Sequence, residues 1–110
     1  MKVVEKENYK ILRDQKDDVK DFASFLASIH DSLENDNLVV DILKYGQLEL
    51  EELLAFLPLS NQHRKNKRSF VIVNDTINID RVPEELLVVP TLLEAEDIIQ
   101  MEEIERDLGF

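Results

Sequence analysis

The apolar positions of this chain fall into short continuous runs and into stripes at helical spacing. The clearest run is Leu38 to Val40, which follows a polar turn and ends in Asp41, as expected of a buried strand in a covered sheet. After Gly46, an apolar stripe at three- and four-residue intervals predicts a helix. Its members are Leu50, Leu53, Leu54 and Leu57. The stretch from Asn37 to Phe56 is therefore predicted to form a strand, a loop and the start of a helix.

Four more short runs predict the remaining strands of one sheet. Residues 3–7 and 9–14 are predicted to form an N-terminal hairpin. Residues 70–73, with the sequence FVIV, predict a second central strand, and residues 86–89 predict a third strand of the same kind. Each run is bounded by polar residues or by proline, so the strands are expected to be short.

Two longer helices follow from apolar residues at helical spacing. The first is capped by Asp17 or Asp18 and extends to Leu33. The second opens with a T-x-x-E capping box at Thr91 and extends to Leu108, with Gly109 suited to its C-terminal side. Pro58 cannot donate a helical hydrogen bond, so the helix after Gly46 is expected to kink or restart there.

The order of these elements predicts one α/β domain spanning residues 1–110. Strands that alternate with helices favour right-handed crossovers and a largely parallel sheet, and the N-terminal hairpin makes that sheet mixed. We expect the helices to pack on one face of it. A chain of 110 residues supports one core, and the 44% apolar content with only 2 Gly and 3 Pro indicates a packed globular protein.

Charge and missing residue types narrow the function classes. The chain has 24 Asp and Glu against 13 Lys and Arg, a net charge of -11, which opposes binding to nucleic acid or anionic lipid. Cysteine is absent, which excludes thiol chemistry and disulfides. No apolar stretch is long enough for export or for a membrane span of about 20 residues. We therefore expect a cytoplasmic protein with no membrane contact.

The one basic segment, Arg64 to Arg68, has only Phe70 as a nearby aromatic residue, and that residue should be buried. A solvated loop that offsets the surrounding acids is therefore favoured over a nucleic-acid patch. His30 is interpreted as an ordinary, partly exposed helix residue, and His63 in the same way. Asp41 can bind a ligand or accept hydrogen bonds from the loop that follows, and the structural role is favoured.

Catalytic patterns are absent from the sequence: no Ser-His-Asp set, phosphate-cradling glycine loop or metal-ligand spacing occurs. No enzymatic activity and no cofactor or metal are therefore expected. The C-terminal helix carries apolar residues beyond the part that a small sheet covers. These are Met101, Ile104, Leu108 and Phe110. They are expected to pack on a neighbouring helix of the domain or on a second subunit.

The element order and several segments resemble the STAS family, the fold of bacterial anti-sigma factor antagonists. The matching segments are NLVVDILKYGQLELEELLAF, SFVIVN, LLVVP and TLLEAEDII. The resemblance implies a small regulatory domain that binds another protein. In that family, a Ser or Thr in an Asp-Ser-Ser/Thr-Gly-Leu motif is phosphorylated to release the partner. By its distance from Asp41 that motif falls on Glu49 to Leu53, and Leu50 stands at the phosphoacceptor position without a hydroxyl.

The sequence therefore predicts a non-enzymatic protein-interaction module that lacks the phosphorylation switch. Glu49 and Glu51 can act there as fixed negative charges, which carry less charge than phosphate. The expected contact surface is the loop after the central strand and the first turn of the next helix. It comprises Lys44, Tyr45, Gly46, Gln47, Glu49, Leu50, Glu51 and Glu52.

Two alternatives remain open. Similar short bacterial chains that end in sequences like MEEIERDLGF are sometimes labelled ribonuclease Z, and with the basic segment this suggests an accessory factor in RNA processing. That family's own activity needs an H-x-H-x-D-H set with further histidines, whereas this chain has 2 His. The other alternative is a homodimer formed through the C-terminal helix.

Overall fold

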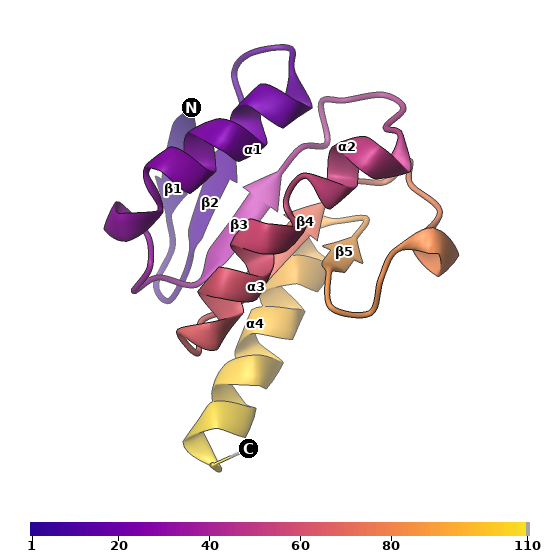
Figure 1. Ribbon diagram of the computed structural model, residues 1–110. Coiled ribbons are helices and arrows are strands. Elements are labelled where there is room, and N and C mark those ends of the chain that lie inside the picture. Colours follow the sequence, from indigo (N-terminus) through magenta and orange to yellow (C-terminus); the bar gives the residue numbers. More distant parts are fainter. Residues whose placement is uncertain (110) are drawn as a thin grey trace.

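The computed structural model describes residues 1–109 and places a five-stranded sheet between two layers of helix (Figure 1). The strands are β1 (Lys2–Glu5), β2 (Lys10–Arg13), β3 (Leu38–Asp41), β4 (Phe70–Val73) and β5 (Leu87–Val89). The α-helices are α1 (Val19–Ser28), α2 (Leu50–Leu54), α3 (Leu57–Lys65) and α4 (Leu92–Asp107). Two short 3₁₀ turns are η1 (His30–Ser32) and η2 (Ile79–Arg81).

The strands lie in the sheet in their order along the chain, from β1 to β5. β1 and β2 form the antiparallel hairpin, and every later pair is parallel. Val39 at the centre of β3 pairs with Ile11 on one side and Val71 on the other. The predicted α/β class and the mixed sheet with its N-terminal hairpin are confirmed.

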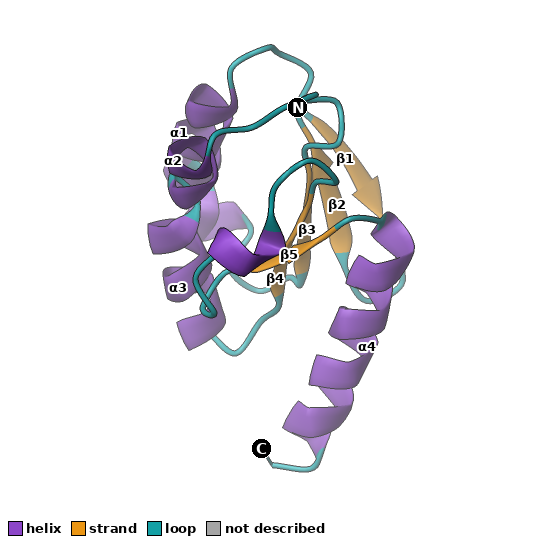
Figure 2. Ribbon diagram, turned by 90° about the vertical axis from the view of Figure 1, so that its right-hand side faces the viewer, coloured by secondary structure: helices purple, strands orange, loops and turns teal. Residues whose placement is uncertain are grey.

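Both faces of the central strands are apolar, and each face has its own helical layer. Alternate residues such as Leu12, Val40 and Ile72 pack in one core with α1, α2 and α3. Val39 and Val71 point the other way, into a second core with α4. The expectation of helices on one face thus holds for α1 to α3, whereas α4 lies on the opposite face (Figure 2). A strand that is apolar on both sides requires cover on both.

The helix boundaries follow local chemistry. Asp18 caps α1, because its carboxylate accepts hydrogen bonds from the amides of Lys20 and Asp21 at 3.0 and 3.1 Å. This helix ends at Ser28, earlier than predicted, and a 3₁₀ turn continues the apolar stripe toward Leu33. The helix restarts close to Pro58, as predicted: α2 ends at Leu54, and α3 begins at Leu57 with Pro58 in its first turn.

The basic segment Arg64–Arg68 is only partly the solvated loop that was predicted. α3 continues to Lys65 because Leu59 and His63 bury one side of it. The Arg64 side chain is partly buried because it pairs with Glu102 of α4, with 2.6 Å between Nη2 and Oε2. The expectation is therefore wrong for the first two residues of the segment, which are helical.

Candidate functional site

The carboxyl ends of β2 and β3 meet at one edge of the sheet. Asp41 ends β3 and is buried there, with 5% of its surface exposed. Its carboxylate pairs with Arg13 Nε of β2 at 2.8 Å and accepts a hydrogen bond from the amide of Leu43 at 3.1 Å. Asp41 thus joins the two strands and shapes the turn after β3, so it has a structural role.

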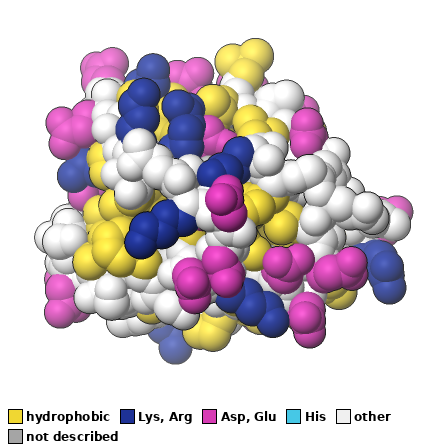
Figure 3. Space-filling model, turned by 90° about the horizontal axis from the view of Figure 1, so that it is seen from above, with side chains coloured by type: hydrophobic (Ala, Val, Ile, Leu, Met, Phe, Trp, Pro, Cys, Tyr) yellow, Lys and Arg dark blue, Asp and Glu magenta, His cyan; other side chains and the backbone are white. Residues whose placement is uncertain are grey.

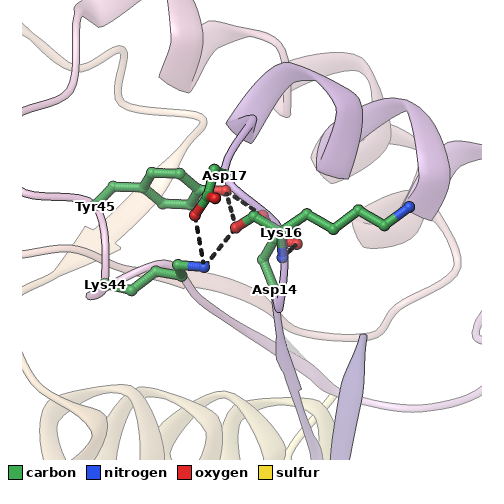
Figure 4. Close-up of polar contacts among 5 residues, drawn as sticks. All are labelled: Asp14, Lys16, Asp17, Lys44 and Tyr45. Atoms are coloured by element: carbon green, nitrogen blue, oxygen red, sulfur yellow. Dashed lines mark hydrogen bonds and ion pairs between the residues drawn. The ribbon is translucent and has the colours of Figure 1, made fainter.

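The loop after β3 is tied to the loop between β2 and α1 by the residues shown in Figure 4. We call these the loop network: Asp14, Lys16, Asp17, Lys44 and Tyr45. The Tyr45 hydroxyl donates to the Asp14 carboxylate and lies 3.2 Å from the carbonyl oxygen of Lys16. The Lys44 ammonium donates to that same carbonyl and lies 3.4 Å from Asp17 Oδ1. Two neighbouring side chains therefore fix the loop at one point.

Electrostatics keep the phenol of Tyr45 protonated. Burial of the ring raises the pKa of Tyr45, and the hydrogen bond to Asp14 raises this pKa further. The other oxygen of Asp14 accepts a hydrogen bond from the amide of Lys16 at 3.0 Å. At neutral pH the phenol is thus a hydrogen-bond donor that positions the loop, and the Asp14 carboxylate is its acceptor.

Beyond the loop network, most of the predicted contact residues face solvent. Gly46, Gln47, Glu49 and Glu51 are exposed. A Cβ atom added at Gly46 would meet no atom within 4 Å, so the backbone there is open to a partner. The carboxylate of Glu51 lies 3.4 Å from the ammonium of Lys20 in α1, and both side chains are more than half exposed. This pair is too exposed to contribute much stability.

The remaining two predicted contact residues have structural positions. Glu52 accepts a hydrogen bond from the backbone amide of Glu49 at 3.0 Å, which caps the start of α2. Leu50 is the first residue of α2 and is half-buried. The structure therefore divides the predicted surface into an anchored part, at Lys44 and Tyr45, and an exposed part formed by Gly46, Gln47, Glu49 and Glu51.

A shallow pocket of about 170 Å³ adjoins the loop network. It is lined by Met1, Phe22 and Phe25, with Asp14, Lys16, Asp18 and Asp21 around them. Figure 3, seen from above, shows apolar, basic and acidic side chains interleaved over the top of the molecule. Sequence reasoning missed this part of the surface. Its one signal was Phe25, an aromatic residue that is not among the buried residues of α1 and is 46% exposed.

At the opposite edge of the sheet, His30 and His63 form a buried pair, so the expectation of partly exposed residues is wrong. His63 Nε2 donates to the carbonyl oxygen of Asp36 at 2.7 Å, because that carbonyl can only accept. His63 Nδ1 is then the acceptor for His30 Nε2, 2.9 Å away. Burial lowers the pKa of His63 to about 4. The two residues are 33 positions apart, and no sequence spacing signals their contact.

The fold and this loop-rich edge define a small α/β domain with a preformed polar surface. No protein-family model and no curated protein matches the chain. Within residues 1–109, no group of three or more His, Asp or Glu side chains is arranged to hold a metal ion. No helix in the same range has the length and apolar character needed to cross a bilayer.

Proposed function

We propose that this domain is a non-enzymatic interaction module that binds another protein through the segment Lys44–Glu52. The observation that carries the proposal is the division of this segment into two parts. Lys44 and Tyr45 are anchored to the β2–α1 loop, while Gly46, Gln47, Glu49 and Glu51 are exposed on either side of the buried Leu48. A loop that is ordered before binding loses less conformational entropy when a partner arrives, so more of the contact energy becomes affinity.

The chemistry of the same edge supports binding over catalysis. Asp41 is paired with Arg13, and Asp14 accepts hydrogen bonds from Tyr45 and from a backbone amide. A general base needs a free acceptor with a pKa near the working pH. Asp41 instead joins β2 to β3, and Asp14 holds the two loops together. The raised pKa of Tyr45 keeps its phenol neutral.

The resemblance to anti-sigma factor antagonists implies a regulatory partner in the cytoplasm of a bacterium. Leu50 stands where that family carries its phosphorylated hydroxyl, so the module we propose has no phosphorylation switch at this position. Glu49 and Glu51 give the same turn a permanent negative charge, and both are exposed. A partner with a basic or hydrogen-bond-donating surface matches this turn.

Affinity capture from a native lysate tests the proposal when two matched variants are compared. Glu51→Arg reverses a charge inside the proposed surface, and Glu85→Arg reverses an exposed charge outside it. We expect the wild type and Glu85→Arg to recover the same protein, and Glu51→Arg to recover at least tenfold less. Thermal melts of all three establish that they are equally folded. Equal recovery by both variants contradicts the proposal.

Nuclease treatment of half of each lysate separates the two rival functions. Arg64 is paired with Glu102, and Lys67 and Arg68 line hollows together with acidic residues of α4. We therefore expect recovery to be independent of nuclease. Recovery that disappears with nuclease supports the accessory role in RNA processing instead. Sedimentation of the purified protein tests the homodimer alternative.

A further inference from the structure

The outer side of α4 carries most of the large apolar side chains that the described chain exposes. We call them the outer stripe: Leu93, Met101, Ile104 and Leu108, with exposed fractions of 67%, 60%, 60% and 68%. Met101, Ile104 and Leu108 recur at intervals of three and four residues, which places them on one side of the helix. Residues with this spacing are the usual anchors for packing against a second helix.

The opposite side of α4 is held firmly against the sheet. Ala95 and Ile99 are fully buried in the second core. Further along, Glu102 accepts a hydrogen bond from the hydroxyl of Ser69, and Arg106 donates to Asn37. At 3.6 residues per turn, this inner side lies opposite the outer stripe. The helix therefore cannot rotate to bury the stripe without losing both its core contacts and its polar contacts.

Acidic residues surround the outer stripe. Glu94, Asp97, Glu105 and Asp107 are all exposed on α4. Within residues 1–109, none of these four forms a salt bridge. The only base of the helix, Arg106, faces the sheet edge through its hydrogen bonds to Asn37 and Ser69. The stripe is thus an apolar strip with an unneutralised negative border.

We propose that the outer stripe is a docking surface for a basic amphipathic helix of another protein. Met101, Ile104 and Leu108 would receive its apolar face, and its flanking Lys or Arg residues would pair with acids such as Asp97 and Glu105. Charge complementarity of this kind guides the encounter and excludes wrong partners. It also disfavours a second copy of the same helix, because two α4 helices would bring like charges together in a protein of net charge -11.

This surface is separate from the one described under the proposed function. The C-terminal half of α4 extends beyond the sheet, away from the loop after β3 (Figure 1). The contacts of Lys44 and Tyr45 in the loop network involve no residue of α4. Binding to the outer stripe can therefore be tested without knowing the partner of the loop.

A labelled amphipathic peptide of Leu and Lys, about 18 residues long, provides the probe for a fluorescence-anisotropy titration. We expect wild type to bind it at micromolar concentration and Ile104→Ser to bind at least fivefold more weakly. Ile79→Ser is the matched control, since Ile79 is 53% exposed but lies outside α4. This control and Glu51→Arg should bind as wild type does. Replacing Glu105 with Lys should weaken binding, and added salt should weaken it further.

Three results would overturn the proposal. The first is equal affinity of wild type and Ile104→Ser for the Leu/Lys peptide. The second is equal binding of a Leu/Glu peptide, or of a Leu/Lys peptide reordered so that it has no apolar face. The third is a dimer in sedimentation that Ile104→Ser, but not Ile79→Ser, converts to monomer, because a second copy would then occupy the stripe.

Discussion

The two edges of the parallel sheet each carry a polar network, and the two networks differ in burial. At the carboxyl edge, Lys16, Asp17 and Lys44 of the loop network are exposed, and Asp14 is its one buried member. At the amino edge, Asn37, His63 and Ser69 have 3% or less of their surface exposed. A buried polar group must find its partners inside the protein, whereas an exposed one can exchange them for water or for another molecule. The amino edge therefore serves the fold, and the carboxyl edge remains available for binding.

Asn37 is the centre of the amino-edge network. Its Nδ2 donates to the carbonyl oxygen of Asn8 at 3.0 Å and to Glu103 Oε1 at 2.6 Å. Its Oδ1 accepts from the amide of Ser69 at 2.9 Å and from Arg106 Nη2 at 3.2 Å. One side chain thus joins the β1–β2 turn, the start of β4 and α4, which are far apart in the sequence.

The largest effect is expected from Asn37→Ala. The substitution leaves the buried amide of Ser69 without an acceptor and removes a link between α4 and the sheet. Unpaired buried groups cost about 1–3 kcal/mol each, so we expect the free energy of unfolding to fall by about 3 kcal/mol. Urea denaturation at neutral pH measures this change.

Asn35→Ala is the matched control for that experiment, because Asn35 is exposed in the turn before the same strand. Its free energy of unfolding should stay within about 0.5 kcal/mol of wild type. Similar losses for the two variants would show that the side-chain contacts of Asn37 contribute little. That result would contradict the inference that the buried network at the amino edge stabilises the fold.

The second prediction concerns pH and the buried histidine pair. The pKa of His63 is lowered by burial from its ordinary 6.5 to about 4, so the unfolded chain takes up a proton at higher pH than the folded one. The stability that neutral His63 provides is complete above pH 6.5 and is lost as the pH falls toward 4. We expect a loss of about 2 kcal/mol between pH 7.5 and 5.

Urea denaturation across this pH range should show the loss in wild type and a smaller one in His63→Gln. Because this variant can itself be unstable, the ring resonances of His63 in wild type provide a second measurement. They should remain those of the neutral ring, protonated at Nε2, down to pH 5. A ring that titrates between pH 6 and 7 contradicts the prediction.

The parts of the fold that were predictable from sequence are those set by local patterns. Continuous apolar runs predicted β3 and β4, and the capping box at Thr91 predicted the start of α4. The Thr91 hydroxyl does accept a hydrogen bond from the amide of Glu94, at 3.1 Å. The same patterns do not say which face a helix covers. α4 covers the face to which Val39 and Val71 point, and the opposite face is covered by α1 to α3. This division is a property of the assembled sheet.

The candidate site was predictable only in its central loop. The strand end at Asp41 and the turn before α2 indicated where an edge loop would lie, and the loop is there. The partners of that loop were not predictable, because Asp14 meets Tyr45 across 31 positions of sequence. The contact between His30 and His63 was not predictable for the same reason. Contacts between distant side chains follow from packing, which no periodic pattern records.

The smallest of these effects is expected at the carboxyl edge, from Tyr45→Phe. The substitution keeps the ring and removes only the hydroxyl that donates to Asp14. Because Lys44 still anchors the loop and Asp14 keeps its hydrogen bond from the amide of Lys16, we expect the free energy of unfolding to fall by about 1 kcal/mol. Urea denaturation beside Asn37→Ala measures the difference. A loss as large as that of Asn37→Ala would mean that the loop network stabilises the fold as much as the buried network does. The difference in burial between the two networks would then not predict their difference in stability.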